Sequence, residues 1–283
     1  KSTMTATFQK VYPERHLNMG IAEGNMMSVA CGLATCGKVA FASTFAIFAA
    51  ERACEQIRNS ACYPKLDLKV WATHAGLTVG EDGASHQCVE DIAIMRALPN
   101  MTVVQPCDAE STRLAIRAAI DRPGPFYIRL GRMPVDRIYR REDCPFQVGK
   151  AIVLRAGRDV TLAASGIMVH EALKAADRLA EEGVDARVLD LHTIKPIDRD
   201  ALAAASRETG AIVTAEEHVI LGGLGGAVAE VLSTQAPCVL RMVGVEDTFG
   251  RSGKPLELMA MYGLTAERIV EKAREAMAAR DGR

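Results

Sequence analysis

LNMGIAEGN, residues 17–25, sets a single acidic side chain, Glu23, among small and apolar neighbours. From Asn18 to Cys36 the apolar residues return at intervals of three and four, which predicts a buried helix over 18–36 with Glu23 near its start. Burying a carboxylate is costly because the charge loses its hydration. Two interpretations are open at this point: a first-turn acid that complements the helix dipole, or an acid kept for proton-sharing chemistry.

Outward from this segment, short apolar stretches alternate with helical patterns through the first half of the chain. The predicted strands are 38–43, 68–73, 101–105 and 126–130, and the predicted helices are 18–36, 46–61, 89–97 and 108–121. Asp108, which follows Pro106, is the expected N-cap of the last of these helices. Strands that alternate with helices are typical of a parallel sheet with helical crossovers. An α/β domain is therefore predicted here.

A polar and irregular stretch, MPVDRIYRREDCPFQVG at 133–149, precedes a second series of the same kind. Its predicted strands are 151–154, 160–164, 186–191, 211–215 and 238–243, and its predicted helices are 167–182, 198–208, a segment ending at Ser233, and a terminal helix from Thr265. We therefore expect α/β domains at 1–135 and 150–283, joined by a linker at 136–149. The turn GGLGG at 222–226 has neither a Walker-type lysine nor the position of a dinucleotide fingerprint, so it is assigned no ligand.

The overall composition favours a globular protein that acts on small molecules. Of the 283 residues, 49% are hydrophobic and 24% are charged. A net charge of -1 gives no electrostatic signature for nucleic acid or an acidic membrane surface, and no apolar run approaches the ~20 residues of a membrane span. The eight cysteines, Cys31, Cys36, Cys54, Cys62 and Cys238 among them, occur in apolar segments without a CxxC pair or a secretory signal. They are predicted to be reduced and buried in a cytoplasmic protein.

Two further segments concentrate residues suited to binding. STFAIFAAE, residues 43–51, spaces Phe45 and Phe48 three apart, on one face of a predicted helix start, and the spacing alone favours core residues. THAGLTVGEDGASHQ, residues 73–87, follows a predicted strand and holds two histidines and two acids among its glycines. Ligands commonly bind at the carboxyl ends of parallel strands. A solvated turn would explain either histidine alone, but two histidines flanking GEDG favour a binding loop.

MGIAEGN, STFAIF and THAGLTVGEDGASHQ, in this order, closely resemble the pyrimidine-binding domain of transketolase, a thiamine-diphosphate enzyme, and the resemblance continues to the C-terminus. It implies a thiamine-diphosphate-binding fold of the pyrimidine type followed by a transketolase C-terminal domain. In that family the glutamate of the GIxE motif hydrogen-bonds N1′ of the cofactor's aminopyrimidine, a catalytic and cofactor-binding role that falls to Glu23. The aromatic pocket falls to Phe45 and Phe48. A third aromatic residue of some members would fall at Glu51, so one wall of the pocket differs.

The resemblance also implies a sugar site in the loop. His74 matches a histidine at the phosphate end of the substrate, Asp82 matches a residue that binds a sugar hydroxyl, and His86 matches a histidine near the reacting carbon. Histidine titrates near neutral pH and can exchange protons with hydroxyl groups, so His74 and His86 are candidate catalytic residues. A carboxylate such as Asp82 can select one sugar configuration over another.

A phosphate clamp is implied where the last strand of the first half ends. Arg132, in YIRLGRMP, matches an arginine whose forked donors bind phosphate oxygens. Ser2 matches a serine that shares this task, and Arg129 is the second choice for the clamp. Most arginines are solvated surface charges, but one beside a binding loop at a strand's carboxyl end favours an anion site.

No metal ligand is predicted in this chain, because no pair of its histidines and acids has zinc-ligand spacing on one element. In the family the divalent ion, Mg²⁺ or Ca²⁺, bridges the cofactor's diphosphate through a GDG motif and an asparagine of an N-terminal domain. That domain is not in this sequence, and neither is the family strand that ends just before the segment matching Lys1 to Thr3.

The missing parts predict the C-terminal subunit of a split transketolase, or the equivalent fragment of a transketolase, which moves a two-carbon ketol unit from a ketose phosphate to an aldose phosphate. Thiamine diphosphate would be shared with an N-terminal partner subunit that carries the metal site. Self-association through the C-terminal domain would give a heterotetramer by the two-fold symmetry of the family.

Two alternatives are open. A related thiamine enzyme, either a deoxyxylulose-phosphate synthase or the β subunit of a 2-oxoacid dehydrogenase, shares the GIAE motif and the domain order, although GEDGASHQ together with Arg132 favours a sugar phosphate. A non-catalytic partner subunit would keep the fold for assembly or regulation. The joint presence of Glu23, both phenylalanines and the loop residues argues against it.

Overall fold

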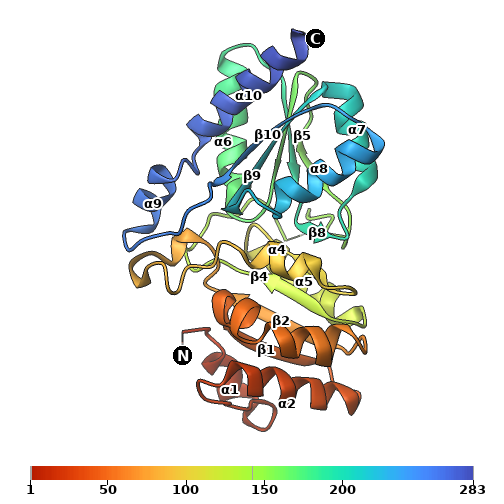
Figure 1. Cartoon of the computed structure of the whole chain (residues 1–283), viewed down its shortest axis with the longest axis vertical. Helices are drawn as coiled ribbons and strands as arrows, with labels where there is room; N and C mark the ends of the chain where they lie inside the picture. Colours follow the sequence, from red (N-terminus) through yellow and green to blue (C-terminus); the bar gives the residue numbers. More distant parts are fainter. Residues whose placement is uncertain (1, 142, 283) are drawn as a thin grey trace.

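Two five-stranded sheets, each flanked by helices, form the framework of the chain (Figure 1). The computed structural model describes residues 2–141 and 143–282. The first sheet comes mainly from the first half of the chain and the second sheet from the second half, and the two units lie one above the other in Figure 1. The predicted fold class, two α/β units in chain order, is confirmed.

The first sheet has the strand order β1, β2, β4, β3, β8. These strands are β1 (Ala40–Phe45), β2 (Leu68–Thr73), β3 (Thr102–Val104), β4 (Phe126–Arg129) and β8 (Thr193–Lys195). The first four run parallel, as predicted, with helical crossovers between them. The edge strand β8 comes from the second half of the chain and runs antiparallel to β3, which the sequence pattern did not predict.

The helices of the first half are shorter and less regular than predicted. They are α1 (Ala6–Val11), α2 (Glu23–Thr35), α3 (Cys54–Gln56), α4 (Asp91–Ala97) and α5 (Ala109–Asp121), with short segments η1 (Pro13–Arg15), η2 (Phe48–Arg52), η3 (Ile57–Cys62) and η4 (Leu77–Asp82). The predicted helix 46–61 is a succession of η2, α3 and η3, of which η2 and η3 have the wide π-helical turn that often accompanies functional sites. Asp108 caps α5 as predicted, accepting the Ser111 N–H at 2.8 Å.

Helix α2 begins at Glu23 instead of at residue 18. Gly20 has a φ of +69°, outside the helical region, and Ala22 is also non-helical, so the chain turns before the helix starts. Ile21, an apolar residue inside the predicted helix 18–36, is 92% exposed. Glu23 is thereby the first helical residue, and it is buried.

The second sheet has the strand order β10, β9, β6, β7, β5. Its strands are β5 (Ile152–Arg155), β6 (Val160–Ala164), β7 (Ala186–Asp190), β9 (Ala211–Val219) and β10 (Val239–Val245), and its helices are α6 (Met168–Glu181), α7 (Arg199–Thr209), α8 (Leu224–Gln235), α9 (Pro255–Met261) and α10 (Ala266–Asp281). All neighbours are parallel except β5, which pairs antiparallel with β7 at the edge. The seven-residue α9 was not predicted.

The two units are joined by packed apolar surfaces. The core beneath β1 and β2 also includes residues of β7, β8 and α8, and the core of the second sheet includes Tyr139 from the polar stretch between the units. Asp108 accepts the Tyr139 N–H at 2.9 Å, which ties that stretch to the start of α5. The connection is therefore packed against both units, and the domain boundaries drawn from the sequence stay a prediction.

The cysteines are less uniformly buried than the sequence predicts. Cys31 and Cys62 are buried, Cys54 and Cys238 are half-buried, and Cys36 is exposed because it lies at the C-terminal end of α2. Burial raises the pKa of the Cys31 and Cys62 thiols to about 11, so these two behave as apolar groups.

Within the described residues, none of the helices combines the length and the apolar character that crossing a membrane requires.

Candidate active site

An aromatic cluster lies where β1 and β2 end. Phe45 and Thr73 are paired in these parallel strands, so the residues that follow them lie side by side. Phe48 stacks on Phe45 with ring centroids 5.9 Å apart, and His74 stacks on Phe45 at 3.8 Å. The prediction that both phenylalanines start a helix is wrong for Phe45, which ends β1, but their two rings do meet.

The second loop histidine joins the same cluster. The His86 ring lies edge-on to Phe45 and Phe48, with centroid distances of 6.3 and 5.5 Å. The Gly76 N–H donates to the Cys88 carbonyl at 2.8 Å and closes the loop, two residues beyond His74 on one side and two residues beyond His86 on the other. The loop therefore returns both histidines to the rings at the end of β1.

The conformation and surroundings of His74 are unusual. Its φ of +57° lies in the left-handed region, which is costly for a residue with a Cβ and persists only where the surrounding structure imposes it. Burial and then the nearby Arg132 lower the pKa of His74, while Asp82 acts in the opposite direction. His74 is thus favoured as a neutral imidazole that can accept or donate a hydrogen bond.

Glu23 reaches this cluster through an arginine that the sequence analysis missed. The Arg52 guanidinium lies 3.6 Å from a Glu23 carboxylate oxygen and 4.7 Å from the centroid of the Phe48 ring, above its face. Arg52 is the last residue of η2, one helical turn from Phe48, and this spacing was the signal that could have identified it. The cluster therefore presents a buried carboxylate, an exposed cation and stacked rings together.

Arg132 lies at the rim of the same loop. It donates to the Val79 carbonyl and lies 3.6 Å from Glu81 and 3.9 Å from Asp82. Its side chain is 41% exposed, so it can exchange these carboxylates for another anion. The structure thus brings Arg132 and Asp82 together, as a shared substrate site requires. Ser2 is exposed in the N-terminal turn, and its role stays a prediction.

Arg129, the second choice for the phosphate clamp, is not available to a substrate. It is 1% exposed and forms a two-pronged ion pair with Asp91, at 2.8 and 3.0 Å. The same guanidinium donates to the carbonyls of Cys88 and Glu217. These four hydrogen bonds join α4, the end of the loop and β9, so the role of Arg129 is structural. A buried ion pair is stable only where its remaining hydrogen bonds are satisfied in this way.

Glu51, where some transketolases carry an aromatic residue, lies on η2 beside Glu90 and Cys88, with the ligand atoms of all three within 4.8 Å of one another. Burial, and then Glu90, raise the pKa of the Glu51 carboxyl. The aromatic surface at the site is instead extended by the two histidine rings, which occupy the side toward the loop.

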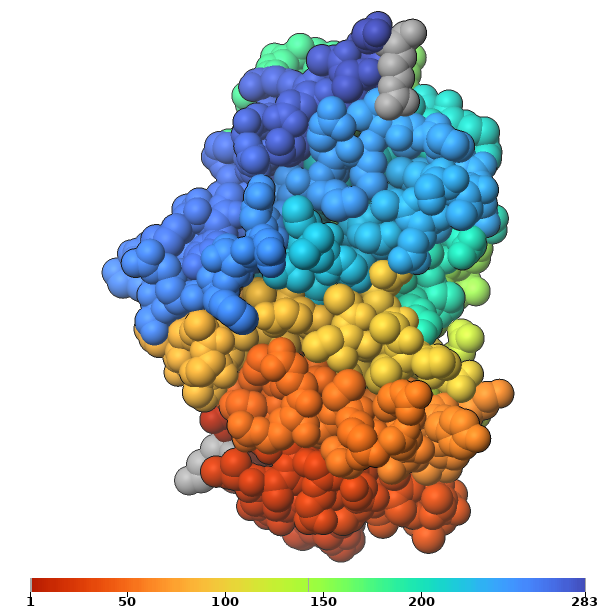
Figure 2. All heavy atoms as spheres, in the orientation of Figure 1, coloured from red at the N-terminus to blue at the C-terminus, as the bar shows by residue number. Residues whose placement is uncertain are grey.

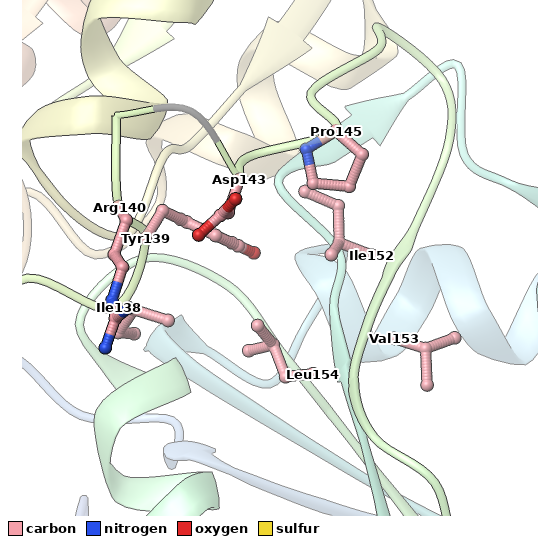
Figure 3. A pocket seen from close by; sticks show the side chains of 8 residues that line it. All are labelled: Ile138, Tyr139, Arg140, Asp143, Pro145, Ile152, Val153 and Leu154. Atoms are coloured by element: carbon pink, nitrogen blue, oxygen red, sulfur yellow. The ribbon is translucent and has the colours of Figure 1, made fainter.

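A cavity of about 310 Å³ lies elsewhere, between the polar connecting stretch and β5 (Figure 3). It is lined by Ile138, Tyr139, Arg140, Asp143, Pro145, Ile152, Val153 and Leu154. None of the sequence-predicted site residues lines it, so it is separate from the aromatic cluster.

The residues of the cluster fit the aminopyrimidine of thiamine diphosphate. An aminopyrimidine needs a carboxylate for its ring nitrogen and flat apolar surfaces for its faces. Glu23 is 7% exposed, and its ion-pair partner Arg52 lies over the face of the Phe48 ring. Phe45, stacked with Phe48, extends the aromatic surface. The fit concerns the pyrimidine end of the cofactor.

Comparison with known proteins places the chain in a family. Residues 1–136 match the family model of the transketolase pyrimidine-binding domain, and residues 149–269 match that of the transketolase C-terminal domain. The chain belongs to the transketolase family.

Within this family the chain is similar, over nearly its whole length, to a transketolase C-terminal section, to a transketolase subunit and to a split-gene transketolase. It is 49% identical to a putative transketolase C-terminal section of Methanocaldococcus jannaschii, covering 98% of this chain and 87% of that protein. It is 45% identical to the 6-deoxy-6-sulfo-D-fructose transketolase subunit SqwH of a Clostridium species, covering 95% and 83%. A solved split-gene transketolase, described as an inactive beta4 tetramer, superposes with a TM-score of 0.93 at 53% identity, covering 99% and 90%.

Proposed function

We propose that this chain is the C-terminal subunit of a split transketolase. It transfers a two-carbon ketol unit from a ketose phosphate to an aldose phosphate with thiamine diphosphate. The observation that carries this proposal is the meeting of Glu23, the stacked Phe45 and Phe48 rings, and the two histidines of the loop 73–87. Similarity over nearly the whole of this chain to a transketolase C-terminal section and to a transketolase subunit supports it.

The cofactor, when bound, supplies the nucleophile and the electron sink for ketol transfer. Glu23 accepts a hydrogen bond from N1′ of the aminopyrimidine and holds a proton at that nitrogen. Phe45 and Phe48 stack against the ring and exclude water from it. His86, which lies against both phenyl rings, exchanges a proton with a hydroxyl at the reacting carbon.

The loop and its rim bind the remainder of the sugar phosphate. Asp82 accepts a hydrogen bond from a sugar hydroxyl and selects its configuration. His74 and Arg132 bind the phosphate, and Arg132 gives up its contacts with the loop carboxylates in exchange. Ser2 completes this end of the site.

An N-terminal partner subunit supplies the rest of the active site, including the diphosphate cradle and its Mg²⁺ or Ca²⁺. The naming of the Clostridium relative as a subunit, and the description of the solved relative as an inactive beta4 tetramer, support this division. Self-association through the C-terminal domain and a location in the cytoplasm, in pentose phosphate metabolism, belong to the same proposal.

The test is an assay of the chain reconstituted with its partner subunit, thiamine diphosphate and Mg²⁺. Turnover of xylulose 5-phosphate with ribose 5-phosphate is expected, and turnover of pyruvate is not. Activity on pyruvate would favour a related thiamine enzyme, and no activity together with no cofactor binding in the complex would favour a non-catalytic subunit.

Replacing Arg132 by alanine is expected to raise KM for a ketose phosphate about 10- to 100-fold, because a charge-assisted hydrogen bond contributes ~1.5–3 kcal/mol. KM for an unphosphorylated ketose should change far less, since the clamp acts on a group remote from the reacting carbon. Steady-state kinetics of the reconstituted enzyme on both substrates decides this. Arg137→Ala, an exposed arginine five residues after Arg132, is the matched control. Equal changes in KM for both substrates in Arg132→Ala would indicate a structural role for Arg132.

A further inference from the structure

Strand β9 carries three consecutive buried ionisable residues, Glu216, Glu217 and His218. Buried acids are costly unless N–H or O–H groups donate to them. Glu216 is accounted for within its own domain, because its carboxylate accepts the Leu224 and Gly225 N–H groups at 2.6 and 2.8 Å at the start of α8. Its neighbour Glu217 faces the other side of the strand.

The Glu217 carboxylate contacts the substrate loop. It accepts the Thr78 N–H at 2.6 Å, across 139 residues of sequence. Gly76 lies against the same carboxylate: a Cβ there would lie 2.3 Å from its carboxyl carbon, and the φ of Gly76 is +81°. Both the space and the backbone conformation therefore require glycine, because the loop backbone rests directly on Glu217.

The contact falls at the neck of the loop. Gly76 and Cys88 form an isolated bridge, and each lies two residues beyond a site histidine, His74 and His86. Arg129 donates to the Cys88 carbonyl at 3.1 Å and to the Glu217 carbonyl at 3.0 Å, so β9 is attached to both sides of the neck.

The end of the loop rests on the C-terminal domain as well. The Gln87 side-chain amide donates to the carbonyls of Leu77 and Arg251, at 3.1 and 2.9 Å. Burial raises the pKa of Glu217, and Arg129 acts in the opposite direction. The Glu217 side chain is thus part of a network of buried contacts, and the members of this network all support the loop.

We propose that Glu217 is a positioning residue, whose carboxylate in the C-terminal domain fixes the neck of the loop and thereby the places of His74 and His86. This inference rests on the proposed function, because it concerns the histidines assigned to the sugar. A shift of the neck moves both imidazoles together, since His74 and His86 each lie two residues from a residue of the neck. Small misplacements of reacting groups have large effects on rate.

The first test measures amide hydrogen exchange in the full-length chain and needs no activity. In Glu217→Ala the Thr78 N–H loses its acceptor, and exchange in the loop 76–88 is expected to rise about tenfold or more. Glu217→Gln keeps an acceptor oxygen at the same reach and should stay near the parent. Glu217→Asp keeps the charge but is one methylene shorter, so exchange in the loop should rise as in Glu217→Ala. It replaces Glu217→Ala in this test if the alanine variant fails to fold.

Glu216→Ala is the matched control, because it removes the neighbouring buried acid of the same strand. It should increase exchange at the start of α8 and leave the loop unchanged. Loop exchange at the parent rate in both Glu217→Ala and Glu217→Asp overturns the proposed contact.

The second test is kinetic and uses the enzyme reconstituted with its partner subunit. Glu217→Ala or Glu217→Asp should lower kcat for a ketose phosphate about 10- to 100-fold, with thiamine-diphosphate affinity unchanged, and Glu217→Gln should restore most of the rate. A mobile loop with a normal kcat overturns the positioning role. If the parent complex has no transketolase activity, the proposed function fails, while the exchange measurement still decides whether Glu217 holds the loop.

Discussion

Replacing Glu23 by glutamine is expected to lower kcat of the reconstituted enzyme about 10²- to 10⁴-fold, the usual contribution of acid–base catalysis. Glutamine has nearly the same shape, so α2 and the burial at its first position should persist. Its neutral amide cannot hold a proton at N1′ as a carboxylate can. Cofactor affinity should fall only modestly, because a hydrogen bond to a charged group is replaced by a weaker one.

The loss must be shown to come from chemistry. The thermal midpoint and the assembly of the variant should be close to those of the parent, since removing one charge from a helix start costs only about 0.3–1 kcal/mol. Glu55→Gln, an exposed position of α3, is the control for removing a nearby glutamate. Turnover of ketose phosphate by the Glu23→Gln complex at the parent rate would show the catalytic assignment to be wrong.

The isolated chain is expected neither to bind thiamine diphosphate tightly nor to catalyse ketol transfer. Its described residues offer a carboxylate and aromatic walls for the pyrimidine, in Glu23, Phe45 and Phe48, but no recognisable cradle for a diphosphate and its metal. Most of the affinity for such a cofactor comes from its charged end, where phosphate oxygens and the metal form charge-assisted contacts. A homodimer of this chain would contain two half-sites.

Titration calorimetry with thiamine diphosphate and Mg²⁺ measures this directly, on the chain alone and on the chain with its partner subunit. Tight binding is expected only for the complex and should disappear when Mg²⁺ is removed by a chelator. The same titration of the partner subunit alone is the control for its own contribution. Tight, metal-dependent binding by the isolated chain would contradict the division of the site between subunits.

The sequence was sufficient for the features that depend on local pattern. Each parallel strand of the first sheet is a short apolar run, and Asp108 caps α5 because its side chain reaches an N–H only three residues away. The site residues Glu23, His74 and His86 were predicted from motifs in which the chemistry lies within a few residues. The parallel pair β1 and β2 brings Phe45 and the loop with both histidines to one edge of the sheet. Glu23, at the start of α2, is connected to this cluster through Arg52.

Tertiary structure alone decided the parts that depend on distant contacts. The three-residue β8 carries too short a pattern to be predicted, and it becomes a strand only because β3 offers it an edge. The sequence could not show that Arg129 is buried against Asp91, because an arginine is solvated or buried according to what packs on it. Nor could it show that Glu217 supports Thr78, since 139 residues separate a hydrogen-bonded pair that only the packing of the two domains brings together.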